Sequence, residues 1–179
     1  MGQTSLYQID AFTGVPFKGN PAAVCLMSCD LEDELYQSIA KEMNLSETAF
    51  VEETSLRGIY NLRWFTPARE VPLCGHATLA SAYVLFEHAG FDGERITFHT
   101  LSGALYAENT PEGIRLDFPR NDPFPVEPPL EALEALGISN PEEVQYSDTN
   151  QKLLVLLGSP EEVRGCSPDF DALLAAENP

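Results

Sequence analysis

The sequence predicts an α+β fold in which strands wrap around one buried helix. The first observation is an almost continuous apolar run over residues 77–86, which has the length of a helix. A helix without a polar face is buried on all sides, and this run is much shorter than the roughly 20 residues of a membrane-spanning helix. The second observation is a series of short apolar or alternating segments at turn-length spacing, which predict strands.

One amphipathic helix and four strands are expected before the buried helix. An apolar residue recurs every four positions after the second strand, which predicts a helix with Leu35 on its apolar side. Asp30 is placed to cap this helix, and Asn44 is placed to end it in the left-handed conformation. The expected strands are residues 7–12, 22–27, 48–52 and 59–65.

The buried helix is expected to stop at Gly90, and hairpin-length turns then separate three further strands. These strands are residues 95–100, 103–108 and 114–118. Five prolines follow within eleven residues, which is typical of a stiff, extended linker. The expected domains are a first lobe at 1–118, a linker at 119–129 and, at 130–179, the incomplete beginning of a second unit that is poor in strands.

The composition and the N-terminus argue against some kinds of binding partner and against a secreted protein. A net charge of -18 argues against nucleic acid and anionic membranes as partners, because both need a basic surface. The four cysteines match no disulfide framework, and the N-terminus has no signal-peptide pattern. We therefore expect a reduced, cytoplasmic protein.

Eight short motifs occur in order along the chain, at residues 9–13, 16–24, 47–51, 63–67, 71–78, 102–103, 116–119 and 153–156. Together they resemble one known family, the phenazine biosynthesis PhzF-like proteins. The resemblance implies the fold of the diaminopimelate epimerases, in which two similar lobes each form a curved, mostly antiparallel sheet around a central helix. It also implies an active site between the lobes.

The resemblance implies a cofactor-independent isomerase or epimerase that acts on a small carboxylate-bearing metabolite. In this interpretation Glu47 is the general acid/base, which removes a proton from carbon and returns it elsewhere. Gly75 and His76 line the substrate pocket at the N-terminus of the buried helix, where open amides can bind an anion. Asn20 either contacts substrate or forms a turn before Pro21.

Each of these residues also has a plainer interpretation. Without the resemblance, Glu47 would be read as a solvated side chain between a helix and a strand, and His76 as a helix-terminal residue paired with backbone groups. Cys74 is either a small side chain that fits beside the helix or an alternative acid/base, since a thiol at a helix N-terminus can have a lowered pKa.

No cofactor and no metal are expected. Cys25, Cys29, Cys74 and His76 have the ligand count of a zinc site. On one extended strand, however, Cys25 and Cys29 would lie about 13 Å apart, too far to share an ion. No phosphate-binding loop or dinucleotide fingerprint is found.

The sequence departs from the family in its second half. The aspartate and the Gly-Ser-Ala stretch that family members carry there are missing, so the chain is expected to be a first lobe plus the opening of a second. Activity of this chain by itself is then in doubt, and the alternative is a non-catalytic binding or assembly module. We expect a homodimer, or pairing with a missing second lobe, because large apolar surfaces rarely stay open to water.

Overall fold

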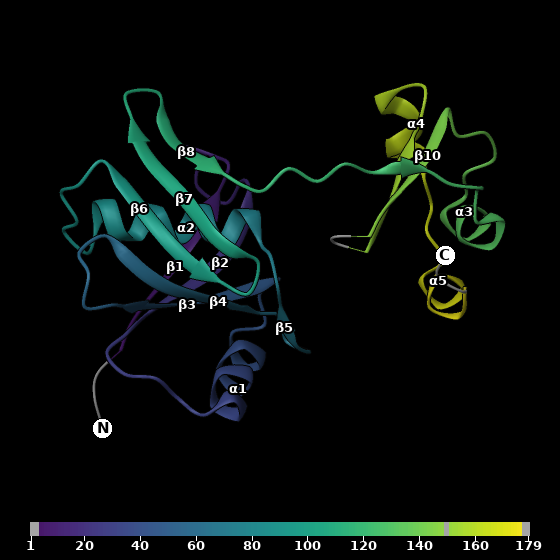
Figure 1. Cartoon of the computed structure of the whole chain (residues 1–179). Helices are drawn as coiled ribbons and strands as arrows, with labels where there is room; N and C mark the ends of the chain where they lie inside the picture. The colour runs from purple at the N-terminus through teal and green to yellow at the C-terminus, as the bar shows by residue number, and fades with distance from the viewer. Residues whose placement is uncertain (1–3, 149–150, 177–179) are drawn as a thin grey trace. The chain divides into compact units, whose positions relative to one another are not determined.

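The structure is a computed structural model that describes residues 4–148 and 151–176. The chain divides into two compact units, Met1–Pro119 and Arg120–Pro179 (Figure 1). The first unit contains an eight-stranded sheet and two helices, and the second contains a three-stranded sheet and three short helices.

The sheet of the first unit is mixed but mostly antiparallel. Its strand order is β1-β2-β3-β4-β6-β7-β8, with β5 paired to the end of β4 that β6 does not reach. All neighbours pair antiparallel except β2 with β3 and β4 with β6. The strands are β1 (Ser5–Ala11), β2 (Asn20–Met27), β3 (Glu47–Glu53), β4 (Ile59–Phe65), β5 (Glu70–Val71), β6 (Arg95–Thr100), β7 (Gly103–Thr110) and β8 (Gly113–Asp117).

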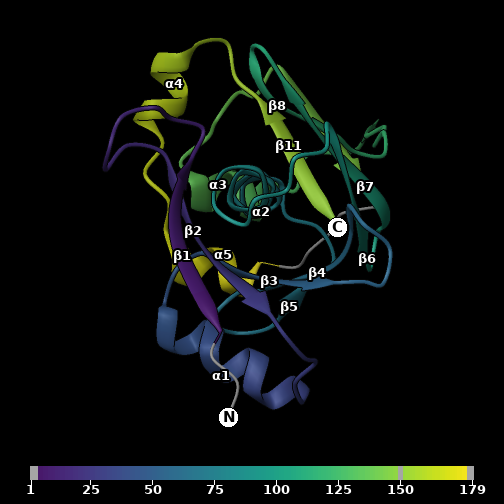
Figure 2. The same cartoon turned by 90° about the vertical axis from the view of Figure 1, so that its left-hand side faces the viewer.

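The predicted buried helix is α2 (Gly75–Glu87), and the sheet curls around it (Figure 2). It packs on β1, β2, β3, β7 and β8. Two hydroxyl groups within it bond to carbonyls four residues earlier, Thr78 to Cys74 and Ser81 to Ala77. Because these polar groups are satisfied inside the helix, most of its circumference can be buried, while Leu79, Tyr83 and Glu87 lie along a more open side. None of the helices among residues 4–148 and 151–176 is long and apolar enough to cross a membrane.

Helix α1 (Asp33–Met43) covers the other face of the sheet, where Tyr36 and Ala40 pack on Phe50 and Phe65. Two expectations for this helix were wrong. Leu35 is 48% exposed, because a spacing of four residues drifts around a helix that has 3.6 residues per turn. Asp30 does not cap the helix; its carboxylate accepts from the hydroxyl of Tyr36 at 2.7 Å.

Other boundaries agree with the sequence patterns. Strand β4 has the predicted bounds, and Asn44 ends α1 with a left-handed φ of 51°. Helix α2 ends at Glu87, and Gly90 follows with a φ of 75°. In all these cases the signal is local, a strict alternation or a residue that tolerates positive φ.

The second unit has more strands than the sequence suggested. Strand β9 (Phe124–Pro125) lies within the proline-rich segment and pairs with β10 (Glu143–Ser147), which in turn pairs with β11 (Lys152–Leu156). The expectation of a strand-poor tail was therefore wrong. Its helices are α3 (Leu130–Leu136), α4 (Pro160–Gly165) and α5 (Phe170–Ala175).

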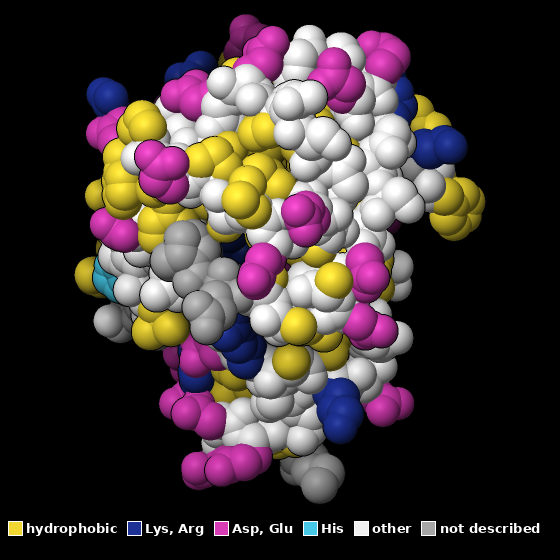
Figure 3. All heavy atoms as spheres, turned by 90° about the vertical axis from the view of Figure 1, so that its right-hand side faces the viewer, with side chains coloured by type: hydrophobic (Ala, Val, Ile, Leu, Met, Phe, Trp, Pro, Cys, Tyr) yellow, Lys and Arg dark blue, Asp and Glu magenta, His cyan; other side chains and the backbone are white. Residues whose placement is uncertain are grey.

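The surface carries the acidic excess as dispersed charges. On the face drawn in Figure 3, acidic side chains are scattered among apolar and neutral ones rather than gathered in one patch. Apolar side chains of the second unit are also exposed, among them Leu154 and Leu156 on β11. These two residues alternate with partly buried neighbours, so they share one face of the strand.

The central position of α2 predicts a large effect of a buried charge. Val84 is fully buried, as expected from the sequence, so Val84→Asp should lower the free energy of unfolding by roughly 3–5 kcal/mol. Tyr83→Asp is the control, because Tyr83 is 40% exposed on the same turn. Urea unfolding followed by circular dichroism measures both, and a Val84→Asp variant as stable as Tyr83→Asp would contradict the enclosed helix.

Candidate active site

The candidate site lies where β3 begins and α2 begins. Glu47 is the first residue of β3, and Cys74 immediately precedes the first residue of α2. Side chains alternate along a strand, so Glu47 faces the same side as Ala49 and Val51, which pack in the core against α2. The register of the sheet thus directs the Glu47 carboxylate toward the mouth of the helix.

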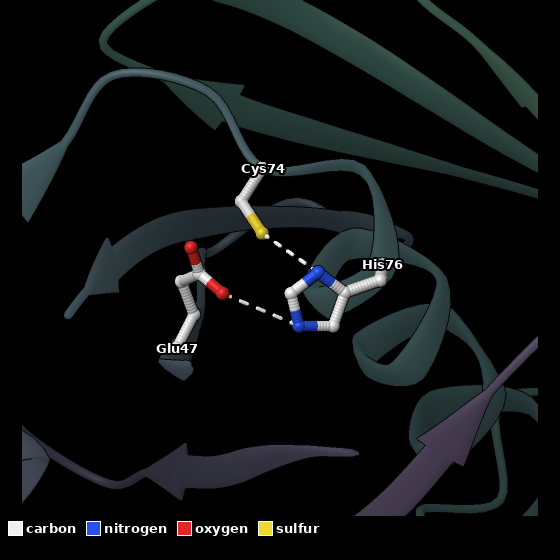
Figure 4. A group of neighbouring side chains, drawn as sticks. All are labelled: Glu47, Cys74 and His76. Carbon is white, nitrogen blue, oxygen red and sulfur yellow. Dashed lines mark hydrogen bonds and ion pairs between the residues drawn. The ribbon is translucent and has the colours of Figure 1, made fainter. Parts of the chain in front are cut away.

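His76 joins these two residues. Its Nε2 lies 3.3 Å from Oε2 of Glu47, and its Nδ1 lies 3.4 Å from Sγ of Cys74 (Figure 4). Exposure falls from 20% for the Glu47 side chain to 9% for that of His76. Cys74 is buried as well. The carboxylate therefore remains open to a small molecule, while the imidazole and the thiol are enclosed behind it.

A second set of contacts brings Asn20 to the edge of the site. The Ser46 hydroxyl lies 3.4 Å from Nε2 of His76 and donates to Oδ1 of Asn20 at 3.4 Å. Asn20 begins β2 and pairs with Ala11, so it lies in the sheet, and its side-chain oxygen bonds to Ser46. Asn20 is exposed, which leaves its side chain accessible from solvent.

The environment of Cys74 favours the protonated form of its thiol. Burial raises the pKa of Cys74 to about 12, and the nearby negative charge of Glu47 adds to the increase. Backbone N–H groups of Ala77 and His76 act in the opposite direction, but the loss of hydration is the larger effect. Cys74 therefore stays protonated at neutral pH, in contrast to the lowered pKa that a position at a helix N-terminus could produce.

Gly75, the first residue of α2, leaves the N-terminus of the helix open on one side. It is exposed, and a Cβ built at this position would meet no atom within 4 Å. The first turn of α2 contains no acidic residue of its own. Open amides at the start of a helix can bind a carboxylate, and the Glu47 carboxylate already lies beside this end of α2, 3.3 Å from Nε2 of His76.

The same side chains include potential metal ligands. One ligand atom from each of Glu47, Cys74 and His76 lies within 4.8 Å of the others. In the structure, however, the carboxylate and the sulfur approach different nitrogens of the ring, whereas an ion bound to His76 would occupy only one of them. Cys25 packs in the core on the opposite face of the sheet, beneath α1, so it does not extend this set.

The structure thus brings together Glu47, Cys74 and His76, with Gly75 beside them and Asn20 linked through Ser46. Ser46 was missed by the sequence interpretation. It precedes Glu47 directly and contacts Asn20 and His76, which are 26 and 30 positions away in the chain. Its only sequence signal was the position next to Glu47, because nothing local shows contacts over such separations.

Comparison with known proteins identifies the family. Residues 9–178 match the family described as phenazine biosynthesis-like protein. The chain belongs to this family. An uncharacterized isomerase of Pseudomonas aeruginosa is 49% identical over 171 residues, which cover 96% of this chain and 64% of that protein.

Solved structures agree with this assignment. A crystal structure of a PhzF family protein from Enterococcus faecalis has a TM-score of 0.83 at 41% identity and covers 97% of this chain and 64% of the other. A predicted epimerase from Pseudomonas aeruginosa, at 22% identity, has a TM-score of 0.74, which shows a shared fold. The PhzF-like interpretation of the motifs is therefore confirmed, and the chain spans about two thirds of the length of these relatives.

The site predicts a clear order of thiol reactivity. Cys25 and Cys74 are buried and have pKa values raised to about 11 and about 12, whereas Cys29 is exposed. Iodoacetamide at mildly alkaline pH should modify Cys29 first, and Cys25 and Cys74 only after unfolding. Peptide mass spectrometry over time measures each site. Rapid alkylation of Cys74 in the folded protein would show that its thiol is exposed or ionised.

Proposed function

We propose that the chain contains the proton-transferring residue of a cofactor-independent isomerase or epimerase, with Glu47 as the acid/base. The observation that carries the proposal is the position of the Glu47 carboxylate, which is part-exposed, 3.3 Å from Nε2 of His76, and at the mouth of a buried helix. A carboxylate there can reach a small molecule and is held in place by a hydrogen-bond donor. The isomerase name of the Pseudomonas aeruginosa relative supports the reaction class.

The choice of Glu47 over Cys74 follows from proton affinity. An efficient acid/base has a pKa near the working pH, because it must both accept and release the proton. Burial raises the pKa of Cys74 to about 12, so its thiolate is scarce at neutral pH. The thiol is also enclosed, whereas the Glu47 side chain is 20% exposed.

The proposed reaction is a proton shift. Glu47 takes a proton from a carbon of the substrate, so that the C–H bond breaks and its electron pair stays on the substrate as a delocalised anion. The protonated carboxyl group then returns the proton to a different carbon or to the other face of the same one. No redox partner is required, because each electron pair remains in the substrate.

The proposed substrate is a small metabolite that bears a carboxylate. The first amides of α2 face an opening beside Gly75 and can hydrogen-bond the carboxylate, and the positive end of the helix dipole favours the negative charge. We assign His76 and Asn20 to the wall of the same pocket, where Asn20 offers an exposed amide. Binding at this point places the substrate next to Glu47.

The proposal predicts solvent exchange that depends on Glu47. A chain fused to the C-terminal third of the Pseudomonas aeruginosa relative should exchange a substrate C–H with deuterium oxide, measured by proton NMR on a panel of small carboxylic acids. Glu47→Gln preserves the shape but removes the base, so the exchange rate should fall by about 10²-fold or more. The chain without the fusion is assayed in parallel.

Glu52→Gln is the matched control. Glu52 lies on β3 like Glu47, but it points to the other face of the sheet and accepts from Asn61 at 3.0 Å. Its removal should change exchange little. Full exchange in Glu47→Gln, together with no exchange in Cys74→Ser, would assign the acid/base role to Cys74. If neither the fused nor the unfused chain exchanges with any acid tested, the result would favour a binding or assembly module instead.

We also propose that the protein associates with a second copy of itself. Leu154 and Leu156 are 55% and 48% exposed on one face of β11, and Phe170 and Leu174 are exposed on α5. Apolar side chains in such numbers on a small unit favour an interface. The proposal commits to a homodimer, because leucines exposed on one face of β11 can pack against the same leucines of a second copy.

Sedimentation velocity over a range of concentrations tests this association. The wild-type chain should shift from monomer to dimer as concentration rises, and Leu154→Glu should move the transition to higher concentration by placing a charge in the interface. Leu56→Glu places the same charge at a 60% exposed leucine of the first unit and is the control. A wild-type chain that stays monomeric at high concentration would refute the dimer.

A further inference from the structure

The imidazole of His76 has a different neighbour at each of its two nitrogens. Nδ1 lies 3.4 Å from Sγ of Cys74, while Nε2 lies 3.3 Å from Oε2 of Glu47 and 3.4 Å from Oγ of Ser46 (Figure 4). In a neutral imidazole one nitrogen donates and the other accepts. The neighbour that must donate therefore decides which nitrogen carries the proton.

Cys74 is the neighbour that can donate to Nδ1, whereas the Glu47 carboxylate beside Nε2 can only accept. Its thiol is buried and keeps its proton, as described above, so it approaches the ring as an S–H group. The other groups that act on the sulfur are the backbone N–H groups of Ala77 and His76, which are themselves donors. The sulfur can accept from these amides and donate its own hydrogen to Nδ1, the acceptor within reach.

We propose that Cys74 is a positioning residue whose S–H donates to Nδ1 of His76 and so places the ring proton on Nε2, facing Glu47. This inference rests on the proposed role of Glu47 as the base. The Nε2–H group then donates to Oε2 and holds the carboxylate in one orientation. Figure 4 shows the other oxygen of Glu47 turned away from the ring, which leaves it available for the substrate proton.

The arrangement has a chemical consequence. If Nδ1 carried the proton, Nε2 would present a lone pair to a carboxylate, and the two would repel each other. The thiol excludes this state by occupying the lone pair of Nδ1. A second-layer group that sets a histidine tautomer in this way is a known means of orienting an imidazole. Here the donor is a thiol that burial keeps protonated.

Nitrogen-15 NMR of the imidazole tests the proposal on the chain itself, without substrate. The chain has three histidines, and His76→Asn assigns the resonances of His76. In the wild type, Nδ1 should resonate as an unprotonated nitrogen that accepts a hydrogen bond, and Nε2 as a protonated one. A protonated Nδ1 in the wild type would overturn the proposal.

Variants show whether the thiol is responsible. In Cys74→Ala the Nδ1 resonance should shift, either toward that of an unprotonated nitrogen without a hydrogen bond or toward that of a protonated nitrogen. In Cys74→Ser it should stay close to the wild-type position, because a hydroxyl can also donate. Cys25→Ala is the control, since Cys25 is an equally buried thiol on the other face of the sheet. Unchanged His76 resonances in Cys74→Ala would overturn the proposal.

A second readout does not depend on the fold of the alanine variant. The infrared S–H stretching band of Cys74, identified as the difference between the wild type and Cys74→Ser, should lie at the lowered frequency of a donating thiol. A band at the frequency of a free thiol, or no band, would overturn the proposal. A confirmed tautomer without deuterium exchange would refute only the proposed function, and exchange through Glu47 with a protonated Nδ1 would refute only the role of Cys74.

Discussion

The burial of α2 inside the curled sheet is the constraint on which the first unit depends. The helix has no polar face because its hydroxyl groups, on Thr78 and Ser81, are bonded to its own carbonyls. Its small residues Ala77, Ala80 and Ala82 are almost completely inaccessible and let the strands approach closely. Most of the helix is therefore covered, apart from a side at Leu79 and Tyr83, and its N-terminus opens where β3 begins.

This geometry brings a carboxylate from one element into contact with an imidazole and a thiol from another. The thiol and imidazole come from the start of α2, and the carboxylate comes from the start of β3. Burial affects them unequally, since the enclosed thiol retains its proton while the carboxylate is still reached by water. The roles that we propose, a thiol that positions and a carboxylate that reacts, rest on this difference in exposure.

The net charge of -18 would repel an anionic substrate at long range, but it does not decide binding at the site. Exposed charges are screened over about 8 Å at physiological ionic strength. At the mouth of α2 the backbone amides and the helix dipole favour an anion, while the nearby Glu47 carboxylate opposes one and the first turn itself has no acidic residue. A site for a carboxylate can therefore exist within an acidic protein.

The local features of the fold were predictable from sequence, and the less regular ones were not. Strand β4 alternates strictly, and α2 is apolar throughout, so both were found close to their observed bounds. Strand β10 alternates polar and apolar residues over only five positions, and this short signal was missed. The buried face of α1 was misjudged because Tyr36, whose hydroxyl is satisfied by Asp30, fills a site between Phe50 and Phe65 that no spacing rule reveals.

The sequence by itself determined the family, the enclosed helix and the residues at its N-terminus, because each depends on an ordered motif or on the polarity of one short segment. Only the tertiary structure decided which atoms meet. Ser46 contacts His76 from 30 positions away, and Glu47 reaches the same nitrogen because the sheet register places the start of β3 there. The protonation of Cys74 was also decided in three dimensions, since its pKa depends on how completely neighbouring elements remove water from the sulfur.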